Sequence, residues 1–64
     1  MLAHILTTKN KFGILLEGRK HFYKKFTHSE IAFYNATKIK VVDRIVVHDK
    51  NGQVKFIYTI KNEI

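Results

Sequence analysis

The residues of this chain that could do chemistry are aromatic and basic side chains, which occur together in two short segments. Residues 10–15 read Asn-Lys-Phe-Gly-Ile-Leu, and residues 26–31 read Phe-Thr-His-Ser-Glu-Ile. Aromatic rings stack on nucleotide bases and lysines bind phosphate, so two such strands side by side would form a surface for single-stranded nucleic acid. The same rings could instead be core residues of a small β fold. The basic run at 19–25 also contains aromatic residues and could add phosphate contacts.

Length and charge narrow the range of partners. A chain of 64 residues suffices for one domain, spanning 1–64. Its 12 Lys and Arg residues against 5 Asp and Glu residues give a formal charge of +7, which favours phosphate polymers or an acidic protein surface. The absence of cysteine excludes a disulfide framework and thiolate chemistry.

We expect no enzyme activity, no cofactor and no metal site. The four His residues lack the close spacing of metal ligands. Glu17, Glu30 and Asp43 form no evident acid–base pair, and the sequence has no glycine-rich phosphate loop. The N-terminal apolar run is too short for a signal peptide, and no run is long enough to cross a membrane. We therefore expect a cytoplasmic protein without membrane contact.

The chemistry-bearing segments must be positioned by strands, because the hydrophobic period is mostly that of β structure. Alternating apolar residues predict five strands, near residues 2–8, 12–17, 21–28, 41–48 and 54–60. The first two read as a hairpin with Phe12, Ile14 and Leu16 on one face. Thr27 and Glu30 have the spacing of a capping box, which predicts a short helical turn around 29–37.

The last two strands predict a second hairpin. Asn51 and Gly52 tolerate the positive φ of a tight turn. If His48 opposes Gln53 across this turn, Ile45 lies opposite Phe56 on one apolar face. We expect that face, Phe56 included, to be core.

The two aromatic segments also resemble those of a known family. Residues 10–15 are similar to the K-G-F-G-F-I motif of cold-shock domains, and residues 26–31 are similar to their F-V-H-F-S-[AD]-I motif with one residue missing. The order and spacing of the motifs continue in register over nearly the whole chain. We therefore predict an all-β fold, a small five-stranded antiparallel barrel of the oligonucleotide-binding type. The alternative is a ββαββ α+β domain whose helix covers one face of a sheet.

The resemblance implies base stacking at three matching positions, and nearby lysines would hold the backbone of single-stranded RNA or DNA. The predicted binding residues are Lys9, Lys11, Phe12, Lys24, Lys25, Phe26 and His28. Candidates for substitute stacking positions outside the motifs are Phe22, Tyr23, Phe33 and Tyr34. Ile5 and Ile14 stand where the family has aromatic residues, so the face is partly aliphatic. This leaves a second function open: a protein-interaction module that binds an acidic protein or self-associates.

Overall fold

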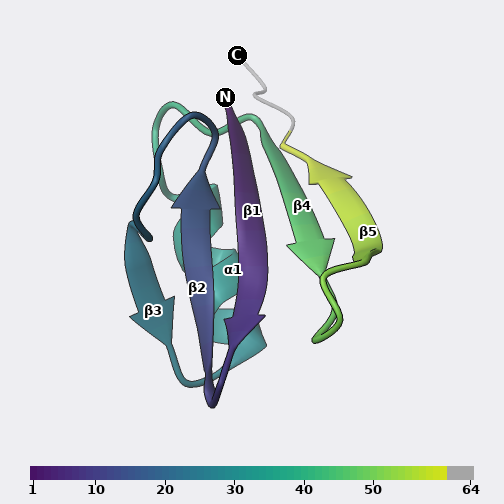
Figure 1. Ribbon diagram of the computed structural model, residues 1–64. Helices are drawn as coiled ribbons and strands as arrows, with labels where there is room; N and C mark the ends of the chain where they lie inside the picture. Colours follow the sequence, from purple (N-terminus) through teal and green to yellow (C-terminus); the bar gives the residue numbers. More distant parts are fainter. Residues whose placement is uncertain (61–64) are drawn as a thin grey trace.

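The computed structural model describes residues 1–60, which form one β-sheet with a short helix on one of its faces (Figure 1). The elements in chain order are β1 (Leu2–Thr8), β2 (Lys11–Leu16), β3 (Lys24–Phe26), α1 (Ser29–Thr37), β4 (Arg44–His48) and β5 (Val54–Thr59). The prediction of a small, mostly β fold with five strands and a helical segment near 29–37 is confirmed.

The sheet is open and mixed, which corrects the prediction of an antiparallel barrel. Its strand order is β3-β2-β1-β4-β5, and β1 pairs in parallel with β4 while the other pairs are antiparallel. α1 connects β3 to β4 across one face of the sheet. The edge strands β3 and β5 lie at opposite sides of the sheet and do not close it (Figure 1). A helix covering one face is the arrangement of the α+β alternative, with one additional strand.

The β1–β2 hairpin follows the predicted alternation. Ile5 and Ile14 lie opposite each other, and both are fully buried. Thr8 pairs with Lys11 across a two-residue turn in which Lys9 has φ 43°. Tight hairpin turns need positive φ, so Lys9 holds a conformation that glycine would adopt without strain.

The core lies between the sheet and α1. Ala32 and Ala36 face the sheet and are fully buried, and their small side chains let the helix approach closely. The buried cluster comprises Ala3, Ile5, Ile14, Leu16, Ala32, Ala36, Val42, Ile45 and Val47. The helix backbone packs against β1, β2, β3 and β4 but does not reach β5. At β5 the helix contributes only side-chain contacts, from the Phe33 ring to Phe56 and Tyr58.

The start of α1 differs from the predicted capping box. His28 is the N-cap, its backbone is extended, and no side chain caps the helix there. The Oγ of Ser29 donates a hydrogen bond to Glu30 Oε1 at 2.9 Å, which engages this carboxylate and lowers its pKa. Thr27 is thus not the cap.

The register of the β4–β5 hairpin also differs, by two residues. Ile45 lies opposite Tyr58 and Val47 opposite Phe56, with a β-bulge between Val47 and His48. The face that carries the apolar residues is nevertheless the predicted one, because a shift of two preserves the alternation. Phe56 is 47% exposed, so its predicted place in the core is wrong, because the α1 backbone does not approach β5.

The turn accounts for one residue of this shift, and the β-bulge between Val47 and His48 accounts for the other. The Oδ1 of Asp49 accepts hydrogen bonds from the N–H groups of Asn51 and Gln53, at 2.9 and 3.0 Å. The N–H of Asp49 donates to the Gln53 carbonyl at 2.8 Å. An Asp side chain that bonds to the backbone ahead of it sets its own turn geometry. The loop thereby closes between Asp49 and Gln53, and only Gly52 takes the positive φ.

Candidate functional site

The two motif phenylalanines come together, on the face that α1 covers. Phe12 and Phe26 lie directly opposite each other across β2 and β3. Both rings are half-buried and pack against the core cluster. Their stacking role stays a prediction, and in this structure both rings contribute to packing.

The other predicted binding residues lie apart from one another. Lys24 is on the helix side of β3, with its ammonium 5.6 Å from the centre of the Phe26 ring. The alternation of β2 and β3 places Lys11 and Lys25 on the opposite face. Lys9 is in the β1–β2 turn, and His28 precedes α1. The seven residues therefore do not form one continuous surface.

Every charged side chain that the strands carry is positive. Within residues 1–60, all acidic residues lie in loops or in α1, whereas the strands contain Lys11, Lys24, Lys25, Arg44 and Lys55. One acidic side chain is also paired: Asp43 Oδ1 lies 2.9 Å from the N-terminal ammonium, which lowers the pKa of this carboxyl. Of the strand cations, Lys11, Lys25 and Arg44 lie on the face of the sheet away from α1, which makes that face electropositive.

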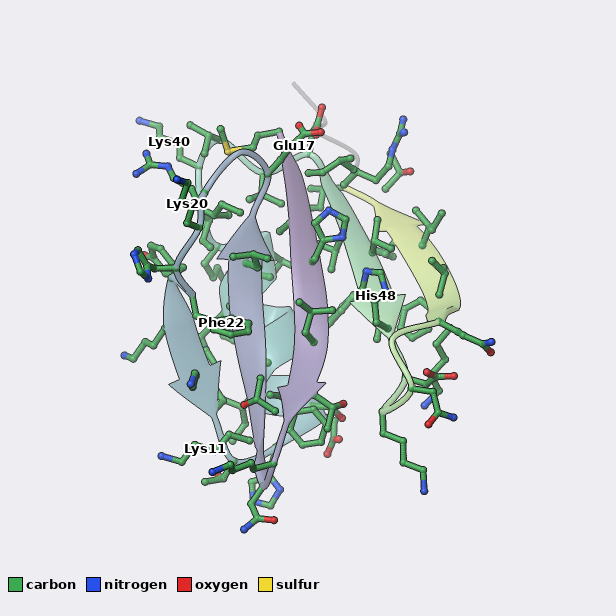
Figure 2. The ribbon with its side chains drawn as sticks, viewed as in Figure 1. Lys11, Glu17, Lys20, Phe22, Lys40 and His48 are labelled. Carbon is green, nitrogen blue, oxygen red and sulfur yellow. The ribbon has the colours of Figure 1, made fainter. Side chains whose placement is uncertain are left out.

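The Phe22 ring packs directly over Gly13, on the face of the sheet away from α1. A Cβ at Gly13 would stand 2.4 Å from Cδ1 and 2.6 Å from Cε1 of Phe22, so only glycine leaves room for the ring. Gly13 pairs with Leu6 and Lys25, all facing away from α1, and Figure 2 shows Phe22 beside β2 in the view onto this face. The Lys25 ammonium lies 5.1 Å from the centre of the ring, within the range of a cation–π contact.

The loop between β2 and β3 continues this arrangement. It forms a hollow of about 400 Å³ lined by Leu16, Arg19, Lys20, His21, Phe22 and Tyr23. The N–H of Tyr23 donates to the Ile14 carbonyl at 2.7 Å, which holds the segment against β2. The Tyr23 side chain itself is 58% exposed. We use the name basic surface for Lys11, Arg19, Lys20, Phe22, Tyr23 and Lys25.

The two motifs contain only Lys11 of this surface. The sequence predicts Lys25 as a neighbouring lysine and the basic run at 19–25 as a source of phosphate contacts, and it offers Phe22 and Tyr23 only as substitute stacking positions outside the motifs. The signal that could have found them is the glycine of the first motif, because a glycine inside a strand often marks close approach by another group. Its partner ring, however, comes from an irregular segment whose path the sequence does not specify.

A second hollow, of about 680 Å³, lies between α1 and β5. Its apolar lining includes Phe12, Phe33, Val47 and Phe56. The Phe33 ring centre lies 6.1 Å from that of Phe56 and 5.2 Å from that of Tyr58. The charged groups at this α1–β5 groove are Glu30, Asp49, Lys50 and Lys55, which sum to zero. This groove is thus the apolar and locally neutral part of a strongly basic protein.

A histidine pair joins β1 and β4 on the uncovered face. His4 Nδ1 and His48 Nε2 are 3.0 Å apart, and His48 Nδ1 is 3.2 Å from the Gly52 carbonyl. A carbonyl only accepts, so Nδ1 of His48 donates to Gly52, and in a neutral imidazole the Nε2 of His48 then accepts from Nδ1 of His4. Among the residues described, no three His, Cys, Asp or Glu side chains cluster as a metal site would require, and no helix is long and apolar enough to cross a membrane.

Comparisons of the chain with protein-family models, with curated proteins and with solved structures find no match. The resemblance of residues 10–15 and 26–31 to cold-shock motifs therefore stays a prediction. Any function must be inferred from the surfaces themselves.

Proposed function

We propose that this protein binds single-stranded nucleic acid at the basic surface. The observation that carries the proposal is the hollow beside β2, whose lining combines Arg19, Lys20 and His21 with the rings of Phe22 and Tyr23. None of its lining residues is acidic. Proteins that bind single strands combine a positive track for the backbone with aromatic rings for the bases, and this hollow has both components.

Of the two aromatic residues of the basic surface, Tyr23 has the more exposed side chain. Its side chain is 58% exposed while its backbone is held by the hydrogen bond to Ile14, so the ring is available without being loosely attached. Phe22 is half-buried against Gly13 and offers its remaining surface beside Lys25. Because the Lys25 side chain is exposed, its ammonium can leave the ring and bind a phosphate when a base arrives.

The phosphate backbone would contact four cations, Lys11, Arg19, Lys20 and Lys25. Each neutralised phosphate of a single strand contributes a slope of about −0.7 to the dependence of log affinity on log salt, so four contacts give about −2.8. The electropositive sheet face beside these residues favours approach of the polymer but adds no sequence preference.

The test is a fluorescence-anisotropy titration of labelled oligo-U and oligo-dT at two salt concentrations. Tyr23→Ala should weaken binding by about 1 to 3 kcal/mol, the usual contribution of one stacked base. Tyr34→Ala is the matched control, because Tyr34 is 61% exposed and also has a lysine near its ring, but lies on α1. Equal losses in both variants, or none in either, would contradict a specific role for Tyr23.

A second comparison tests the charges. Lys20→Gln should lower both the affinity and the salt slope, whereas Lys50→Gln, an exposed lysine in the β4–β5 turn, should change neither by much. Competition with poly-glutamate distinguishes an acidic protein partner. If poly-glutamate displaces the oligonucleotide at equal charge concentration and Tyr23→Ala has no effect, the protein recognises acidic chains rather than bases.

A further inference from the structure

The edge of the sheet that β5 forms is both unpaired and apolar in a single copy of the described chain. β5 forms the edge of the sheet, and all six of its residues are exposed. Four of them are large and apolar: Val54 at 56%, Phe56 at 47%, Ile57 at 58% and Tyr58 at 45% exposure. Stable monomers usually protect an edge strand with charges, a proline or a covering element, because its free backbone groups pair readily with another strand.

We propose that two copies of the chain associate through β5, each copy adding its edge strand antiparallel to the other. A two-fold axis at this edge would run perpendicular to the sheet, so both helices would lie on one side and both uncovered faces on the other. The backbone N–H and C=O groups of β5 in each copy would form hydrogen bonds with the unpaired backbone groups of β5 in the other copy. This inference is independent of nucleic-acid binding.

Charge favours a second copy at this edge and disfavours one at the opposite edge. The chain carries +7 overall, so two copies repel each other over most of their surfaces. The charged residues of the α1–β5 groove sum to zero, and Lys55 is the one charge within β5. β3, by contrast, consists of Lys24, Lys25 and Phe26, so pairing two copies there would oppose like charges.

The register of the strand also permits self-pairing. In an antiparallel pair related by a two-fold axis, one residue lies opposite its own counterpart. An axis at Phe56 sets Lys55 opposite Ile57, and an axis at Ile57 sets Lys55 opposite Thr59. Only an axis at Lys55 itself would bring two ammonium groups together. The two central registers are therefore both free of charge repulsion.

The available area indicates a weak dimer. A fully buried aromatic side chain removes about 150 to 250 Å² from water, so the two half-exposed rings of Phe56 and Tyr58 offer roughly 200 Å² per copy, and the smaller Val54 and Ile57 add less than that. A specific interface needs about 500 Å² per partner. The edge backbone and the groove rim must supply the remainder. We expect a dissociation constant in the micromolar range.

The primary test is sedimentation equilibrium of the full chain from micromolar to near-millimolar concentration. The parent should change from monomer to dimer over this range, and Ile57→Lys should weaken the association at least about tenfold by adding a charge to the paired strand. Tyr23→Lys is the matched control, because Tyr23 is also 58% exposed but lies far from β5 in the sheet. A parent that stays monomeric, or a dimer that Ile57→Lys does not weaken, would overturn the proposal.

Cross-linking supplies a second readout that does not depend on the lysine variant. The chain has no cysteine, so Ile57→Cys and Phe56→Cys each introduce a single thiol. Directly opposed residues in an antiparallel pair have Cβ atoms about 4.5 to 5.5 Å apart, close enough for a disulfide after a small adjustment. Mild oxidation should cross-link at least one of these variants much faster than Tyr23→Cys. Equal rates for all three would contradict β5 pairing.

Salt separates this proposal from the proposed function. Higher salt screens the repulsion between two +7 copies and should strengthen the dimer, whereas it should weaken binding of an oligonucleotide. A dimer that forms without nucleic-acid binding would refute only the proposed function. Binding by a protein that stays monomeric would refute only the dimer.

Discussion

Replacing Gly13 by alanine should force Phe22 away from β2. Gly13 has no positive φ, so an alanine fits the backbone and would by itself stabilise the strand by about 0.4 to 1 kcal/mol through the unfolded state. The new methyl group would overlap Phe22 Cδ1, 2.4 Å away, and overpacking of this kind costs about 1 to 3 kcal/mol. Gly13→Ala should therefore destabilise the protein when the ring is present and stabilise it slightly in a Phe22→Ala background.

The assay is urea unfolding of the parent, the two single variants and the double variant. The coupling energy between the substitutions should equal the overlap cost, about 1 to 3 kcal/mol. The oligonucleotide affinity of Gly13→Ala should also fall, because the displaced ring no longer lies beside Lys25. Additive effects, with a coupling below about 0.5 kcal/mol, would show that Phe22 does not lie against Gly13.

Three further outcomes follow from particular residues. Lys9→Gly should raise the free energy of unfolding by about 0.5 to 1 kcal/mol, because relief of the strain at φ 43° outweighs the added conformational entropy of the unfolded chain. A lower urea midpoint for this variant would contradict the turn geometry. Phe12→Ala should cost about 2 kcal/mol of stability, less than a fully buried ring, and leave the oligonucleotide affinity of the folded protein nearly unchanged. The N-terminal ammonium lowers the pKa of Asp43 from its usual value of 3.8, so the ionised carboxylate stabilises the fold above pH 3.8. This stabilisation is lost as the pH falls below 3.8 towards the lowered pKa. Asp43→Asn should lack this part of the acid sensitivity, as measured by urea unfolding midpoints from about pH 5 downward.

Sequence reasoning succeeds where neighbours along the chain decide the structure. The alternation from Phe12 to Leu16 determines which face of β2 is buried, and the helix at Ser29–Thr37 lies in the segment expected for it. Gly52 also takes the positive φ that a turn residue should take. These features depend on local periods and turn chemistry, which a single sequence displays directly.

Prediction from the sequence fails where contacts between distant parts of the chain determine the structure. The parallel pairing of β1 with β4 depends on how α1 crosses the sheet, and nothing in either strand specifies a parallel partner. The register of β5 differs from the prediction because the Asp49 side chain closes the turn one residue later than expected, and the β-bulge between Val47 and His48 adds a second residue. For the candidate site, Lys11 is predicted from the first motif and Lys25 as a lysine next to the second. The position of Phe22 is not predicted, because it follows from a contact with Gly13 across the sheet.

The most direct test of nucleic-acid binding at the basic surface is an NMR titration of the isotope-labelled protein with unlabelled oligo-U. The chain has no proline, so every residue after Met1 contributes a backbone amide signal. Shift changes should concentrate at Lys11, Gly13 and the segment from Arg19 to Lys25, while the amides of α1 and β5 change little. No shift changes at saturating oligonucleotide, or changes centred on the α1–β5 groove, would contradict binding at the basic surface.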